Sequence, residues 1–193
     1  MRSSGPLSPL QRTALAVQGL LDSFDGEGAI IGGVAVALYY DARSTVDVDA
    51  FVLGKGRTFE QILQTAKDHG FLPRREDALE FSKSKFVFLL IYPETGVEVD
   101  LIVALTGLEA DIAKRAVRVD VGDGQLVVPT VEDLILMKLI AQRASDLADV
   151  EALLQTNPHV DRKRILKQVR EFAELTDQAD MAETAERLLK EEQ

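Results

Sequence analysis

Residues 30–52, IIGGVAVALYYDARSTVDVDAFV, contain the pattern that decides the fold. A short apolar run ends at two glycines, helical spacing follows, and two aspartates then alternate with apolar residues. A strand, two glycines and a helix in this order present backbone N–H groups at the positive end of the helix, where a phosphate binds well. Gly32 and Gly33 are therefore candidate phosphate-binding residues, although a tight strand-to-helix turn needs glycine for packing as well.

The second half of this stretch places two carboxylates on one side of a predicted strand, VDVDAFVL. Side chains of a strand alternate between its faces, so Asp47 and Asp49 point the same way, about 6.5 Å apart along the chain. Unpaired burial among apolar residues would be costly, so we expect both to line a cleft and hold a cation. Oxygen ligands favour hard ions such as Mg²⁺ or Mn²⁺. The other interpretation is the exposed polar face of an edge strand.

A predicted hairpin supplies further carboxylates. The apolar strands FVFLLIY and VEVDLIVA are joined by a turn that contains proline and glycine. Glu98 and Asp100 share one face of the second strand. Three carboxylates from two strands suit a two-metal site for phosphoryl transfer, in which Asp100 acts on the attacking hydroxyl by ligation or as general base. Glu98 is the competing third carboxylate, and pairing of Asp100 with a nearby lysine is the structural alternative.

The rest of the chain divides into three predicted segments. Residues 1–8 form a flexible lead, residues 9–128 a core of strands and helices, and residues 129–193 a helical region packed on that core. Lys138 stands among apolar residues of this region, where a charge needs a partner or a ligand. On one continuous helix it would share a face with Asp149.

A break in that helix would change the pairing. With a break near residues 144–145, Ser145 would cap the next helix, and Arg143 and Asp146 would form a structural pair. The helix itself is expected to open on Thr130, with Asp133 three residues on, as a variant of the capping box.

Composition limits the function further. The formal net charge of −10 argues against a protein that coats nucleic acid through a broad basic face. A local basic rim from Arg74, Arg75, Lys83 and Lys85 stays open, with a solvated surface as the alternative. The chain has no cysteine, which excludes disulfides, thiolate metal sites and a thiol nucleophile. Without an apolar run of roughly 20 residues, we expect a cytoplasmic protein with no membrane partner.

The order of a glycine pair, a helix, the motif R-S-T-x-D-V-D and a later strand aspartate resembles the nucleotidyltransferase superfamily typified by DNA polymerase β. More narrowly, it resembles the AbiEii/AbiGii-type toxin nucleotidyltransferases and related uncharacterised bacterial families, over roughly residues 28–155. The resemblance implies an α/β (α+β) nucleotidyltransferase fold, with a mixed central sheet flanked by helices and a C-terminal helical region.

The resemblance also implies roles for individual residues. Many members of the superfamily have Gly-Ser where this chain has Gly-Gly, so one hydroxyl is absent here. Matched by position, the glycine motif is Gly32 and Gly33, the metal ligands are Asp47, Asp49 and Asp100, the residues beside phosphate are Arg43, Ser44 and Thr45, and the lysine that reaches the triphosphate is Lys138, followed by Asp146 and Asp149.

The activity that the resemblance implies is the transfer of a nucleoside monophosphate from a nucleoside triphosphate, such as ATP, to a hydroxyl acceptor, with release of pyrophosphate. Mg²⁺ or Mn²⁺ would be the cofactor, a tRNA end or a protein the acceptor, and a cognate antitoxin the partner in a bacterial toxin-antitoxin or abortive-infection system. Three alternatives remain: an inactive nucleotide-binding or regulatory protein of this fold, an aminoglycoside-type small-molecule nucleotidyltransferase, and a plain interaction domain with structural glycines and aspartates.

Overall fold

The computed structural model describes residues 7–40 and 45–190. The chain forms two compact units, one of Met1–Ala37 and Arg43–Pro129 and the other of Leu38–Ala42 and Thr130–Gln193. The first unit contains the strands and the candidate carboxylates, and the second is helical. Residues 1–6 of the predicted lead lie outside the described residues, as do the candidate phosphate contacts Arg43 and Ser44.

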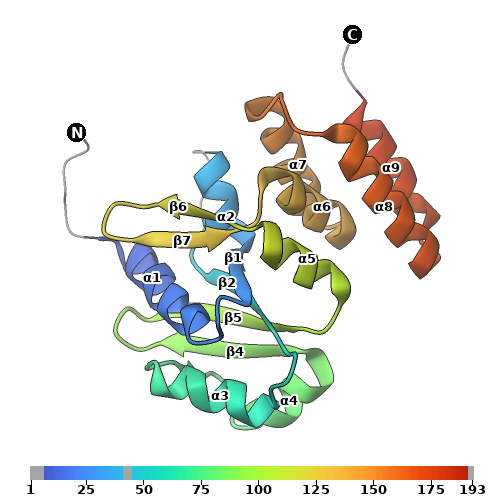
Figure 1. Ribbon diagram of the computed structural model, residues 1–193. Helices are drawn as coiled ribbons and strands as arrows, with labels where there is room; N and C mark the ends of the chain where they lie inside the picture. The colour runs from blue at the N-terminus through green and yellow to red at the C-terminus, as the bar shows by residue number, and fades with distance from the viewer. Residues whose placement is uncertain (1–6, 41–44, 191–193) are drawn as a thin grey trace. The chain divides into compact units, whose positions relative to one another are not determined.

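A five-stranded mixed sheet forms the centre of the first unit (Figure 1). Its second and third strands pair in parallel, and all other neighbours are antiparallel. The mixed sheet and the hairpin of residues 87–104 were both predicted from the sequence and are confirmed. In spatial order the strands are β1 (Gly28–Ile31), β2 (Val48–Leu53), β5 (Val97–Ala104), β4 (Val87–Tyr92) and β3 (Leu72–Pro73).

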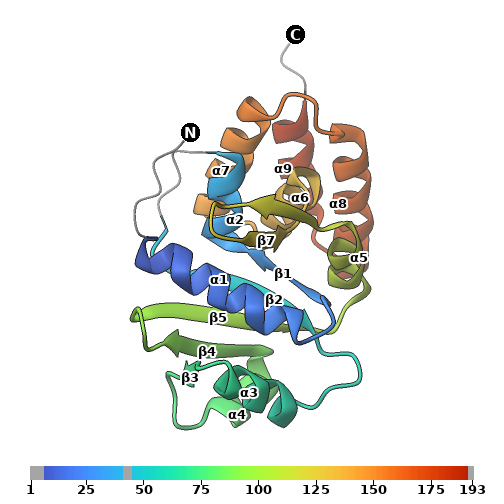
Figure 2. The ribbon, with the colours of Figure 1, turned by 60° about the vertical axis from the view of Figure 1, so that its left-hand side comes forward.

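Helices and a small hairpin complete this unit. Helix α1 lies along β1 and β2, whereas α3 and α4 lie beside β3 and β4 (Figure 2). Ser8 and Thr58 each cap a helix through a capping box. These elements are α1 (Pro9–Asp22), α2 (Gly32–Tyr39), α3 (Phe59–Asp68), α4 (Ala78–Lys85), α5 (Gly107–Arg115), β6 (Val117–Asp120) and β7 (Gln125–Val128).

The period-two pattern of β5 separates core from surface. Val99, Leu101 and Val103 are buried, whereas Glu98 is exposed and Asp100 is half-buried between them. Burial of such side chains stabilises a sheet by about 1.5–3 kcal/mol each. The apolar face of β5 therefore packs in the core, and its polar face is turned away from it.

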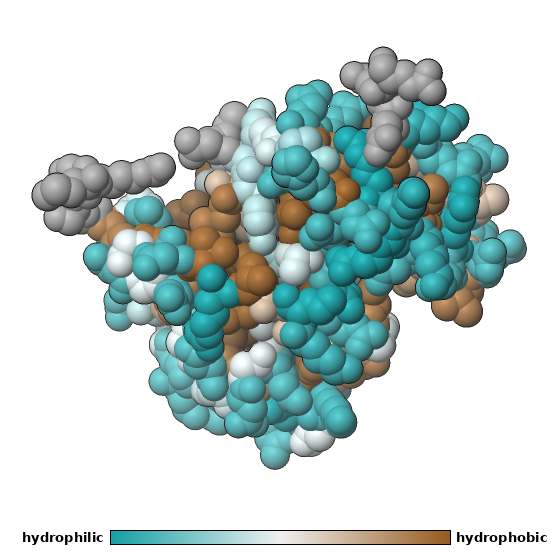
Figure 3. Space-filling model, turned by 45° about the horizontal axis from the view of Figure 1, so that its top comes forward, coloured by the Kyte–Doolittle hydropathy of each residue, from teal (hydrophilic) through white to brown (hydrophobic). Residues whose placement is uncertain are grey.

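The second unit is built from four helices within the described residues: α6 (Val131–Ala141), α7 (Ala144–Thr156), α8 (Arg162–Thr176) and α9 (Ala179–Leu189). Thr130 accepts a hydrogen bond from the Asp133 N–H at 3.2 Å, which confirms the predicted cap of α6. Hydrophilic residues cover much of the face seen in Figure 3, although apolar residues also reach that surface. None of the described helices is long and apolar enough to cross a membrane.

Candidate functional site

The centre of the candidate site is the pairing of β2 with β5. In this parallel pair Asp49 lies directly opposite Asp100, and cross-strand neighbours place their side chains on the same face of a sheet. Both residues are half-buried. Two carboxylates that are far apart in sequence are thus brought together by strand register alone.

Gly32 lies against Asp49. It follows the last residue of β1, Ile31, which pairs with Asp49. Its backbone has φ +62°, and a Cβ added there would lie 1.9 Å from Asp49 Oδ2. A side chain at this position would overlap the carboxylate, so glycine is required both for the turn and for the close approach of the aspartate.

Asp47 stands just outside the strand. The sequence predicted both aspartates within one strand, but β2 begins at Val48, and Asp47 lies in the exposed bend before it. Thr45 holds this bend by donating its hydroxyl hydrogen to Asp47 Oδ1 at 2.8 Å. A Cβ on Gly33 would lie 2.5 Å from Thr45 Oγ1. Thr45 thus places its hydroxyl against Gly33.

Arg74 is the residue of this site that the sequence did not reveal. Its guanidinium donates to Glu98 Oε2 through one terminal nitrogen and to Asp100 Oδ1 through the other. The side chain is 24% exposed, so neither a basic rim nor a solvated face describes it. Its role depends on strand register, which no local pattern near residue 74 indicates.

The carboxyl of Asp100 sits in a field of opposing charges. Burial raises its pKa above the ordinary aspartate value, Arg74 acts against that rise, and Asp47 and Glu98 add to it. Burial and like charges both disfavour the ionised form of a carboxyl. Neighbouring carboxylates thus make this end of the sheet a place where an added cation is electrostatically favoured.

The donor set fits a hard divalent cation in its chemistry, because three aspartates offer oxygen ligands only and Gly32 leaves room for the Asp49 carboxylate. Its geometry is less complete. Within residues 7–40 and 45–190, no three histidine, aspartate or glutamate side chains are gathered closely enough to hold a metal ion. One oxygen of Asp100 is instead bonded to Arg74.

Lys138 belongs to the second unit and is buried there. Its ammonium lies 2.7 Å from Asp146 Oδ1 and 2.9 Å from Asp149 Oδ2, and all three side chains are at most 10% exposed. The structure breaks the helix at Gln142, which adopts a left-handed conformation, and Ser145 does not cap α7. Lys138 nevertheless reaches both acids. Its predicted contact with a triphosphate stays a prediction.

The break in the helix also places the next arginine. Arg143 occupies the N-cap position of α7, and its Nε lies 3.9 Å from Asp146 Oδ2. The structural pair of Arg143 and Asp146 predicted for a broken helix is therefore present, with the arginine side chain 80% exposed.

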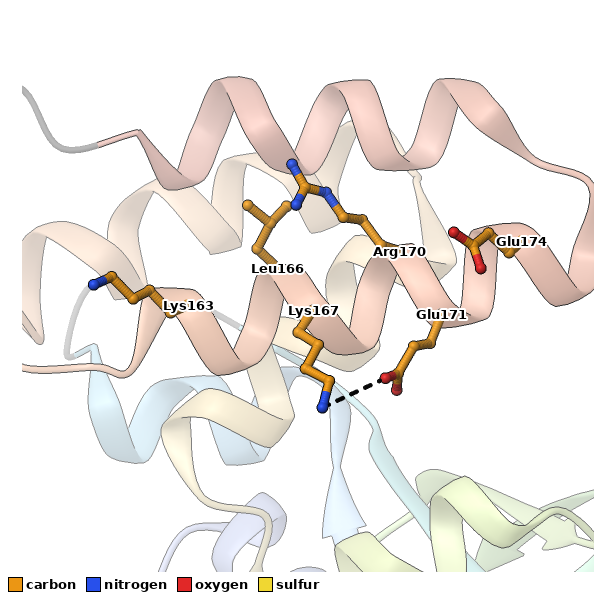
Figure 4. A pocket seen from close by; sticks show the side chains of 6 residues that line it. All are labelled: Lys163, Leu166, Lys167, Arg170, Glu171 and Glu174. Atoms are coloured by element: carbon orange, nitrogen blue, oxygen red, sulfur yellow. Dashed lines mark ion pairs between the residues drawn. The ribbon is translucent and has the colours of Figure 1, made fainter.

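An open groove of about 290 Å³ runs along α8 in the second unit (Figure 4). Two lysines, an arginine and two glutamates line it, and Lys167 faces Glu171 at 3.7 Å. The mixture of charges and the single aliphatic side chain, Leu166, offer no convergent set of catalytic groups. The candidate site therefore stays with the carboxylates of the sheet.

Comparison with solved structures shows the fold. The chain resembles an antigenic nucleotidyltransferase-like protein from Paracoccidioides brasiliensis, with a TM-score of 0.58 and 17% sequence identity, over 94% of this chain and 95% of that chain. Similarity at this identity shows the fold alone, which is that of a nucleotidyltransferase-like protein.

The family follows from the sequence itself. Residues 15–193 match the family described as nucleotidyl transferase AbiEii toxin, type IV toxin-antitoxin system, so this chain belongs to the AbiEii family. No curated protein matches the sequence significantly. The family that the glycine and aspartate motifs indicated is thus confirmed, and it makes the chain a nucleotidyltransferase of toxin type.

Proposed function

We propose that this protein transfers a nucleoside monophosphate from a nucleoside triphosphate to a hydroxyl group, at the site formed by Asp47, Asp49 and Asp100. The observation that carries the proposal is the register of β2 and β5, which sets Asp49 opposite Asp100 while Gly32 packs against Asp49. Family membership over residues 15–193 supports the same activity.

In the proposed reaction, the acceptor oxygen bonds to the α-phosphorus, and the bond from that phosphorus to the bridging oxygen breaks, so pyrophosphate leaves. The acceptor proton goes to Asp100, whose pKa is raised by burial, which makes it a stronger base than an ordinary aspartate. Asp47, Asp49 and Asp100 would hold Mg²⁺ or Mn²⁺. A bound divalent ion supplies charge stabilisation for the attacking and leaving oxygens.

The remaining proposed roles belong to residues at and near the glycine turn. Backbone N–H groups at the start of α2, next to Gly32 and Gly33, would bind phosphate oxygens at the positive end of that helix. Thr45 would keep Asp47 oriented through its hydroxyl. Arg43 and Ser44 are proposed as further contacts of the phosphates, on the strength of their place in the sequence motif.

The proposed acceptor is a hydroxyl of an RNA end or of a protein, because the family is one of toxins. A cognate antitoxin is the partner that a toxin-antitoxin family implies. One observation favours a second candidate, a nucleotide-binding protein without transferase activity: Asp100 is bonded to Arg74, so the base of the reaction is engaged.

Thermal unfolding with each nucleoside triphosphate, with and without Mn²⁺ or Mg²⁺, tests binding, since a ligand of the folded state raises the midpoint by mass action. We expect a shift that needs both nucleotide and metal and that disappears in the double variant Asp47→Asn, Asp49→Asn. Asp68→Asn, which changes an exposed carboxylate at the end of α3, should keep the shift.

Transfer itself is then followed with α-labelled nucleotide and a mixture of tRNA and protein acceptors. Label in an acceptor, lost in the double variant, supports the enzyme. Binding without label supports the inactive nucleotide-binding protein, and turnover retained in the double variant would rule out the proposed carboxylate site.

A further inference from the structure

Strand register fixes the backbone of Arg74 two strands away from Asp100. Arg74 follows β3, and its N–H donates to the carbonyl of Leu89 at 2.9 Å. Leu89 in turn pairs with Asp100 across β4 and β5. The arginine side chain thus extends over β4 to reach the carboxylates on β5.

The arginine is divided between two acceptors. One terminal nitrogen binds Glu98 and the other binds Asp100, whereas the buried Nε has no hydrogen-bond partner. A guanidinium binds best when two parallel N–H bonds go to one carboxylate, and a buried donor without a partner is unfavourable. Transfer of the whole fork to Glu98 would allow Nε to bond, and it would release Asp100.

The charge of Arg74 also lies where a metal ion bound to Asp100 would act. Asp47 and Glu98 both act electrostatically on Asp100, and Arg74 offsets them. A divalent ion bound to Asp100 would perform the same neutralisation. Two cations that neutralise one carboxylate compete for it.

We propose that Arg74 is the resident cation of the metal-free site, which holds Asp100 until a divalent ion displaces it, while Glu98 retains the released guanidinium. This inference rests on the proposed function, because it takes Asp100 as a metal ligand. Arg74 acts through Asp100 and is therefore a positioning residue. Glu98, the competing third carboxylate, becomes the anchor of the arginine.

Mn²⁺ titration of the purified 193-residue chain, with free Mn²⁺ measured by electron paramagnetic resonance, tests this competition without relying on turnover. Arg74→Gln should bind Mn²⁺ roughly fivefold more tightly than the wild type, the effect of removing one partly exposed ion pair. The matched control is Arg75→Gln, whose guanidinium pairs with Asp77 at 2.8 and 2.9 Å. It should bind Mn²⁺ like the wild type.

A second readout separates this role from a merely structural one. Without metal, Arg74→Gln should unfold at a lower temperature than the wild type, because it leaves Asp100 and Glu98 without their cation. Saturating Mn²⁺ should raise the unfolding midpoint of this variant by more than it raises that of the wild type. A purely structural ion pair predicts the same loss with and without Mn²⁺.

Arg74→Lys covers the case in which the glutamine variant does not fold. Lysine keeps the charge but lacks the fork, so its Mn²⁺ affinity should fall between those of the wild type and Arg74→Gln. Affinity equal to or weaker than the wild type in the variants that fold would overturn the competition while leaving the metal site standing. No Mn²⁺ binding in any variant would overturn both, and would count against the metal in the proposed function.

Discussion

At the scale of single residues, Gly32 carries two constraints that can be separated. Its positive φ alone disfavours other residues, and the nearby Asp49 carboxylate leaves no room for a Cβ. Gly56 shares the first constraint without the second, with φ +75° and nothing within 4 Å of an added Cβ. Substitutions at the two glycines can therefore be compared to measure the free-energy cost of the overlap with Asp49.

We expect Gly56→Ala to lower the free energy of unfolding by about 1 kcal/mol, the usual cost of a left-handed alanine. Gly32→Ala should cost at least about 2 kcal/mol, because overlap with Asp49 is added to the backbone term. It should also abolish the metal-dependent midpoint shift. Urea unfolding of both variants measures the difference, and equal costs would show that Asp49 does not lie against Gly32.

Lys138 provides a second test at this scale. Removing one partner of a buried ion pair leaves an uncompensated charge and costs about 3–5 kcal/mol. We therefore expect Lys138→Met to destabilise strongly, because Asp146 and Asp149 would lose their shared cation.

The control is Lys167→Met in the same unit, where an exposed lysine faces Glu171 at 3.7 Å. It should change the free energy of unfolding by less than about 1 kcal/mol. A Lys138→Met variant of normal stability that fails to respond to nucleotide would instead support the predicted contact of Lys138 with the triphosphate. Chemical denaturation with and without nucleotide distinguishes the two results.

At the scale of elements, α3 and α4 are joined by an ion pair whose pH dependence has a definite sign. Lys83 donates to Glu60 at 2.5 Å, and this hydrogen bond is the main cause of a lowered pKa of Glu60. A carboxyl with a lowered pKa in the folded state stabilises that state above its unfolded pKa. The stabilisation is lost as the pH falls through the folded value.

Lys83→Met should therefore lower the unfolding midpoint slightly at neutral pH. The difference from the wild type should vanish as the pH falls below the ordinary glutamate value of about 4.3. Midpoints of both proteins across a pH series give the measurement. A difference that grows on acidification would contradict the assignment to Glu60.

The elements themselves were mostly predictable because their signals are local. The hairpin of β4 and β5 follows from two apolar runs and a turn, and the caps at Ser8, Thr58 and Thr130 follow from single polar residues before apolar periodicity. Helix α4 was not predicted, since its sequence ALEFSKSK has a weak amphipathic pattern. β3 has only two residues, too few for a period.

The candidate site was predictable in part for the same reason. The glycine pair and the aspartates are recognisable from their spacing in the sequence, and Asp49 and Asp100 do lie opposite each other. Arg74 joins the site only because β3, β4 and β5 align Arg74, Leu89 and Asp100. Alignment of three strands is a tertiary property that no single stretch of sequence encodes.

At the scale of the whole molecule, most of the predicted basic rim is already neutralised by carboxylates. Three of the four residues of the predicted basic rim are paired with carboxylates: Arg74 with Glu98 and Asp100, Arg75 with Asp77, and Lys83 with Glu60. Each phosphate contact contributes roughly −0.7 to −0.9 to the slope of log affinity against log salt. A rim whose cations are already paired therefore implies a shallow slope for RNA bound there.

We expect any RNA binding by this protein to fall only weakly with added salt, with a slope magnitude of about 2 or less. Filter binding or fluorescence anisotropy across a salt series measures the slope. Arg75→Gln should leave it nearly unchanged, because its charge is already paired. A slope magnitude near 6 would show that an extensive basic surface contacts the RNA.

The contact between Gly32 and Asp49 also has an evolutionary consequence. A carboxylate at position 49 leaves no space for a side chain at position 32, so the two positions should vary together among related proteins. A relative with a side chain at position 32 should have lost the aspartate at position 49, and with it the chemistry. This pair of positions therefore offers a way to distinguish active transferases from inactive ones by their sequences alone.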